Sequence, residues 1–239
     1  MTRKPGPGRC VHCLKHVEKR NWDHVFPVGW YPDSTPQNLE KWKIPTCKPC
    51  NDEYGRLEED FGQILSFCVD PRRPEAQGVY KRMLRAYDPR YGKNHKDRKI
   101  REAKRRKLLE KMMHGDDIPN QGIYPGLGER WNRDRKDQVA LTIPKRYVDR
   151  LGIKIVRGIA FLEDGIFVED DYEIEPYAVE ADGAKVFEDA IAQHGHSFSR
   201  GPGIVVDRAV AEEDGISSIY KITIWGQLIM YLSILPRDE

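Results

Sequence analysis

Four of the five cysteines in this 239-residue chain fall into two Cys-x-x-Cys pairs. Cys10 and Cys13 form the first pair, and Cys47 and Cys50 form the second after 33 intervening residues. A Cys-x-x-Cys turn presents two thiolates on one side, so two such turns can close the tetrahedral shell that Zn²⁺ takes in structural sites. The spacing therefore predicts a structural zinc held by these four residues.

Two other interpretations of the cysteines remain open. The four residues could be free thiols, or His12 and His16 could replace two of them as ligands. The fifth cysteine, Cys68, stands alone in an apolar helical pattern, which is typical of a core residue.

Between the two pairs lies the stretch Asp23-His24-Val25-Phe26-Pro27, and Asn51 follows Cys50 directly. Histidine has a pKa near neutrality, so His24 could take a proton from water. The ordinary interpretation is equally simple. His24 would be a surface histidine, and Asn51 would cap the helix that starts beside it.

The order of these elements resembles the zinc-containing branch of the HNH (ββα-metal, treble-clef) endonucleases. The resemblance covers about residues 8–65. It rests on five elements in sequence: Cys10–Cys13, Asp23-His24 with its following Pro27, Asn38-Leu39, Cys47–Cys50, and Asn51 at a helix start.

This resemblance implies a metal-dependent endonuclease that hydrolyses phosphodiester bonds of DNA. His24 would be the general base, with Asn38 orienting its imidazole. Asp23 and Asn51 would bind a catalytic divalent ion, and their hard oxygen ligands favour Mg²⁺ or Mn²⁺.

The chain departs from the family pattern near the start of this helix. Gly55 stands where many relatives carry a lysine, and the next residue, Arg56, is expected to contact a phosphate instead. Asp23 and Asn51 supply a single charge, to which Glu59 or Asp60 could add another. A catalytically degenerate, zinc-stabilised nucleic-acid-binding protein is therefore the alternative, and a purely structural or interaction protein is a third hypothesis.

Charge is distributed unevenly along the chain. Residues 1–137 hold 30 Lys/Arg and 20 Asp/Glu, whereas residues 138–239 hold 10 and 18. The basic excess peaks at 93–113 and predicts a nucleic-acid partner, with double-stranded DNA as the expected form. The side chains expected to bind it, besides Arg56, are Lys99, Lys104, Arg105, Arg106 and Lys107. The alternatives are a solvated basic helix or one that the acidic C-terminal half covers.

We expect an α+β protein in three parts: an HNH-like zinc module at 1–69, a helical basic segment and linker at 70–137, and an α+β accessory domain at 138–239. Apolar periodicity predicts helices and β-branched runs predict strands. The expected helices are 52–69, 75–87, 93–113, 145–162 and 183–193, and the expected strands are 139–144, 203–210 and 218–235.

No apolar run reaches the roughly 18 residues that a bilayer-spanning helix needs. The longest candidate, 222–235, is short and is interrupted by Gly226 and Gln227. We therefore expect a cytoplasmic protein with no membrane partner.

Overall fold

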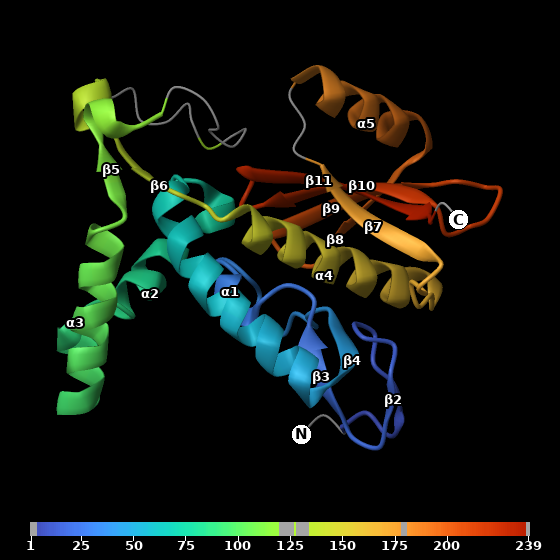
Figure 1. Cartoon of the computed structure of the whole chain (residues 1–239), viewed down its shortest axis with the longest axis horizontal. Helices are drawn as coiled ribbons and strands as arrows, with labels where there is room; N and C mark the ends of the chain where they lie inside the picture. Colours follow the sequence, from blue (N-terminus) through green and yellow to red (C-terminus); the bar gives the residue numbers. More distant parts are fainter. Residues whose placement is uncertain (1–3, 120–126, 128–133, 178–180, 238–239) are drawn as a thin grey trace.

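The computed structural model of the chain describes residues 4–119, 127, 134–177 and 181–237. Within these ranges the fold is α+β, as predicted (Figure 1). The α-helices are α1 (Lys48–Cys68), α2 (Val79–Arg85), α3 (His95–Leu109), α4 (Lys145–Asp164) and α5 (Ala181–His194). The strands are β1 (Gly8–Arg9), β2 (His16–Val17), β3 (Arg20–His24), β4 (Lys43–Cys47), β5 (Met112–His114), β6 (Val139–Leu141), β7 (Tyr172–Tyr177), β8 (His196–Ser199), β9 (Ile204–Val210), β10 (Ser218–Ile224) and β11 (Leu228–Pro236).

The N-terminal part is a β-hairpin followed by a long helix. Strands β3 and β4 pair antiparallel, and α1 begins where β4 ends. Cys47 is the N-cap of α1 and Pro49 lies in its first turn, where a missing N–H costs nothing. One face of α1 buries Leu57, Phe61 and Leu65, which confirms the predicted apolar stripe.

The C-terminal part is an antiparallel five-stranded sheet in the order β7-β11-β10-β9-β8. Figure 1 shows α5 on one face of the sheet and α4 on the other. The predicted strand 218–235 is wrong in one respect, because the chain turns back between β10 and β11. Trp225 and Gly226 both have positive φ, 52° and 66°, as a tight hairpin turn requires.

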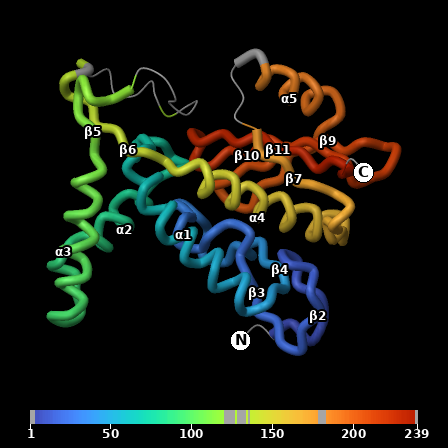
Figure 2. Tube along the Cα trace, viewed as in Figure 1, coloured from blue at the N-terminus to red at the C-terminus, as the bar shows by residue number. Residues whose placement is uncertain are grey.

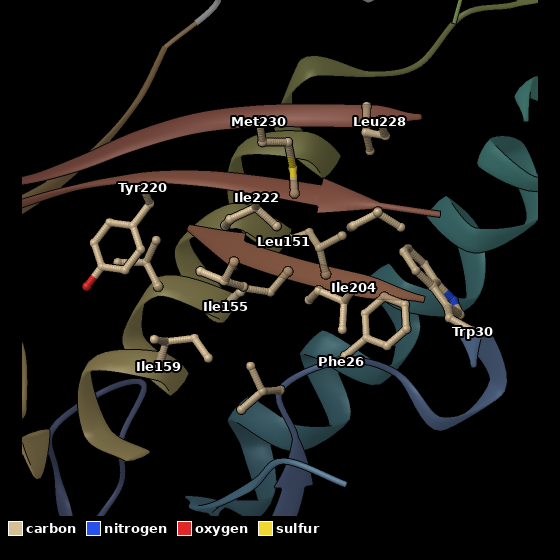
Figure 3. Packing of buried hydrophobic residues seen from close by; sticks show 14 of the residues in the cluster. Phe26, Trp30, Leu151, Ile155, Ile159, Ile204, Tyr220, Ile222, Leu228 and Met230 are labelled. Carbon is tan, nitrogen blue, oxygen red and sulfur yellow. The ribbon is translucent and has the colours of Figure 1, made fainter. Parts of the chain in front are cut away.

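One hydrophobic core joins the N-terminal hairpin to the C-terminal sheet. Phe26 and Trp30 pack against the same cluster as Leu151, Ile155 and Ile159 of α4 and the buried face of the sheet (Figure 3). The indole N–H of Trp225 donates to the carbonyl of Trp30 at 2.8 Å. Residues of the first and third predicted parts therefore share this core.

The basic segment projects to the side of this body. Helices α2 and α3 are shorter than predicted, and a 3₁₀ turn, η3 (Pro89–Tyr91), joins them. After α3 ends, β5 pairs with β6. Figure 2 shows α3 on the opposite side of α1 from the C-terminal sheet. Among the described residues, no ion pair links α3 to 138–239, so the structure does not support the alternative in which the acidic C-terminal half covers this helix.

None of the helices in the described ranges is both long enough and apolar enough to cross a lipid bilayer.

We predict that Gly62→Ala destabilises the protein by about 1–3 kcal/mol, the usual range for overpacking. A Cβ on Gly62 would lie 2.4 Å from the indole nitrogen of Trp30, whose ring is enclosed by Phe61 and Trp225. Gly55→Ala is the matched control on the same helix, because nothing lies within 4 Å of its Cβ position. It should stabilise the helix by up to about 1 kcal/mol. Urea unfolding measures both variants, and equal effects would contradict this packing.

Candidate functional site

The four paired cysteines come together in one group. Their sulfur atoms all lie within 4.8 Å of one another, so the group could hold a metal ion. Cys10 and Cys13 stand in a tight turn after β1, closed by a hydrogen bond from the Leu14 N–H to the Cys10 carbonyl at 2.9 Å. Cys47 ends β4, and Cys50 lies in the first turn of α1.

Burial opposes ionisation of Cys10, Cys47 and Cys50, although backbone hydrogen bonds leave the pKa of Cys10 below its usual value. Burial raises the pKa of the Cys50 thiol, and a hydrogen bond with Cys47 and the nearby charge of Cys10 raise it further. A bound cation removes this penalty because it stabilises the thiolates directly. Cys68 lies outside the group and is half-buried near the end of α1.

His12 and His16 do not belong to the four-cysteine group. His12 is buried, and its Nε2 lies 2.9 Å from the Asp23 carboxylate. His16 is an exposed residue of β2. The alternative in which these histidines replace two cysteines therefore has no support in the geometry.

Asp23 points inward from β3 and has a partner on each oxygen. Oδ2 contacts His12, and Oδ1 accepts a hydrogen bond from the Lys154 ammonium at 3.0 Å. Burial acts to raise the pKa of Asp23, but the His12 hydrogen bond and the Lys154 charge outweigh it and keep that pKa below its usual value. This carboxylate is therefore ionised and already paired.

Lys154 is the centre of the interactions around Asp23, although it comes from α4, about 130 residues later in the chain. Its side chain is 0% exposed. The ammonium donates to Asp23, to the His24 carbonyl at 2.6 Å and to the Glu58 carboxylate, which uses all three of its N–H donors. We call His12, Asp23, Glu58 and Lys154 the buried polar cluster.

Two features of the surroundings hold Lys154 in place. Its ammonium lies 5.5 Å from the ring centre of Tyr54, a cation–π contact. One turn further along α4, Gly158 approaches Val25, the residue after β3, so closely that a Cβ would lie 2.6 Å from the Val25 side chain. The lack of a side chain at Gly158 therefore lets α4 reach the hairpin.

Glu58 completes the charge balance of the cluster. Burial raises its pKa to about 7, because it outweighs the stabilising charge of Lys154. The cluster therefore combines one ionised carboxylate, one ammonium and one carboxyl group that is protonated over much of the range below neutrality.

His24 lies at the end of β3, on the opposite face of the strand from Asp23, as alternation along a strand requires. Its side chain is half-buried. Burial lowers the pKa of His24, and the charges of Lys154, Lys41 and Lys43 lower it further against the effect of Asp23. The imidazole is therefore neutral at physiological pH, the form in which it could accept a proton.

The two asparagines have different positions. The amide nitrogen of Asn51 donates to the carbonyl of Trp22 at 3.1 Å, which ties the start of α1 to β3. Asn51 is thus not the helix N-cap, a position that Cys47 occupies. Asn38 is exposed in the loop before β4, and among the described contacts no hydrogen bond connects it to His24.

The sequence suggested Glu59 or Asp60 as an additional acidic residue of the site, but the acidic side chain of α1 that turns inward is that of Glu58. Glu59 forms an ion pair with Lys104 of α3 at 2.8 Å, and Asp60 is exposed. The Lys104 ammonium therefore already has an acidic partner. Arg56 is exposed on α1, and the remaining predicted contacts lie on the exposed surface of α3: Lys99, Arg105, Arg106 and Lys107.

Sequence reasoning missed Lys154 and Glu58, although a signal was present for the lysine. Lys154 interrupts the apolar stripe of α4, between Leu151 and Ile155, where a charged residue must find a buried partner. The identity of that partner depends on tertiary contacts that no local pattern encodes.

Comparison of the chain with protein-family models, with curated proteins and with solved structures found no match in any of the three.

We predict that Lys154→Met destabilises the protein by about 3–5 kcal/mol, because it leaves Asp23 buried without its cation. Lys145→Met is the matched control, since Lys145 lies in the first turn of the same helix with a side chain 62% exposed and an ion pair to Asp149. It should cost less than about 1 kcal/mol. Chemical denaturation of both variants measures the difference, and a mild effect at Lys154 would show that the ion pair is not formed.

Proposed function

We propose that this chain is a nucleic-acid-binding protein built on a zinc-stabilised, HNH-like ββα (treble-clef) frame, in which a lysine has replaced the catalytic metal. The observation that carries the proposal is the position of Lys154. Its ammonium pairs with Asp23, the carboxylate that the family resemblance makes a ligand of the divalent ion, and also with Glu58.

A structural zinc fits the four-cysteine group. With Zn–S bonds of about 2.3 Å, the edge of a tetrahedral site is about 3.8 Å. The sulfur atoms of Cys13 and Cys47 are 3.8 Å apart. The ββα order of hairpin, cysteine and helix supports the treble-clef assignment.

A catalytic Mg²⁺ or Mn²⁺ does not fit the buried polar cluster. Both oxygens of Asp23 have partners, and Lys154 would have to leave before a cation could enter. The flanking residues Leu151, Ile155 and Ile159 are fully buried in the common core. Burial of such side chains contributes about 1.5–3 kcal/mol each, so exposing three would consume much of a typical domain's stability of about 5–15 kcal/mol.

Nucleic-acid binding is supported by the charge of the projecting helices. Residues 78–111, which include α2 and α3, hold 14 Lys/Arg and 4 Asp/Glu, a balance of +10. Most of these basic side chains are exposed, and α3 lies on the opposite side of α1 from the C-terminal sheet (Figure 1). Such a surface binds phosphates because it displaces condensed counterions.

A second candidate is metal-dependent cleavage of DNA with His24 as general base, and one observation favours it. The His24 side chain is only half-buried and is neutral near pH 7, so it retains the properties of a base.

We predict one zinc per chain, lost together with part of the stability in Cys47→Ser. A three-thiolate shell binds zinc more weakly, and the metal would join the turn after β1 to the end of β4 and the start of α1. Cys68→Ser removes the cysteine outside the group and should keep the zinc. Elemental analysis with thermal unfolding measures both. Full zinc content in Cys47→Ser would refute the site.

We further predict salt-sensitive binding to plasmid DNA, without nicking in Mg²⁺ or Mn²⁺. Binding should be lost when Arg105, Arg106 and Lys107 are replaced together by glutamate, because phosphate attraction becomes repulsion. His24→Ala should bind as the parent protein does. Gel-shift and plasmid-nicking assays measure both properties, and nicking that disappears in His24→Ala would favour the second candidate over the proposal.

A further inference from the structure

An open cavity of about 520 Å³ lies between the end of α1, α2, η3 and α3. Its walls combine apolar and basic side chains. Phe67 and Leu108 belong to the apolar part, and Lys81, Arg85 and Arg105 belong to the basic part. The cavity therefore suits a ligand that has both a flat or apolar group and negative charge.

The lining also includes Tyr91, an aromatic ring with 54% of its surface exposed. The guanidinium of Arg85 lies 5.5 Å from the ring centre of Tyr91. An exposed ring beside an arginine plane is the arrangement on which an unpaired base can stack. Helix α3 alone contains no aromatic residue, so this surface exists only because η3 packs beside it.

Three basic side chains of the cavity lining have no carboxylate ion-pair partner in the described part of the chain: Lys81, Arg85 and Arg105. Asp88 is its acidic residue, and Arg90 holds that carboxylate with a hydrogen bond of 2.7 Å. In the part of the chain that the structure describes, no carboxylate forms an ion pair with Lys81, Arg85 or Arg105. These side chains can therefore bind phosphates.

We propose that this cavity binds an unpaired nucleotide of single-stranded DNA or RNA, with its base against Tyr91 and the neighbouring phosphates at Lys81 and Arg105. The inference rests on the proposed nucleic-acid binding and specifies its substrate. Bases in a duplex are stacked on each other and cannot stack on the Tyr91 ring, whereas single-stranded bases can.

Fluorescence anisotropy with labelled dT20, U20 and a 20-base-pair duplex tests the proposal on the full chain. Tyr91→Ala should weaken binding to the single strands at least about fivefold, the smaller end of the effect of losing one base–aromatic stack. Duplex binding should stay within about twofold, since phosphate contacts dominate there. Tyr91→Phe should bind as the parent protein does, and the dT20 and U20 arms show whether DNA or RNA is preferred.

Lys99→Ala is the charge control, because Lys99 lies on α3 outside the cavity lining. It should weaken all three ligands alike, whereas Arg105→Ala should weaken the single strands more than the duplex. Equal effects of Tyr91→Ala on all ligands, or none, would overturn the cavity assignment while leaving nucleic-acid binding intact. Absence of binding by the parent protein to every ligand would overturn both proposals.

Discussion

The ammonium of Lys154 is the interaction on which the arrangement of this protein depends. It joins a helix of the C-terminal part to a strand and a helix of the N-terminal part through Asp23, the His24 carbonyl and Glu58. A fully buried lysine is tolerated only when its charge is compensated and all of its donors are used, and both conditions are met. The same contact fixes how α4 lies on the hairpin and leaves Asp23 with no free oxygen for another cation.

The sequence alone predicted the features that depend on local residue patterns. The cysteine spacing identified the four ligand candidates, because each Cys-x-x-Cys turn is a local pattern that can be recognised in the sequence. The stripe of Leu57, Phe61 and Leu65 identified α1 for the same reason. The state of the predicted catalytic groups could not be found in this way, because Asp23 obtains its partner from residue 154 and the relevant acid proved to be Glu58 rather than Glu59 or Asp60.

The basic segment shows the same limit. As a linear pattern, α3 carries positive charge without aromatic residues, which predicts phosphate binding and nothing more specific. Packing adds Tyr91 from η3 and Phe67 from α1 to its edge. The proposed specificity for unpaired bases therefore depends on the packing of three elements, whereas the proposed attraction to nucleic acid depends only on the basic composition of α3. The four-cysteine group and the shared core belong to the body from which this arm projects.

Whether Lys154 has replaced a catalytic metal is tested most directly by titrating Mn²⁺ into the zinc-containing protein and following free Mn²⁺ by electron paramagnetic resonance. With the ammonium paired to Asp23 and Glu58, no Mn²⁺ site should fill below about 1 mM, since a weakly charged and occupied site binds such ions poorly. Binding of one Mn²⁺ per chain at micromolar concentration, lost in Asp23→Asn, would contradict this account and restore the carboxylate as a metal ligand.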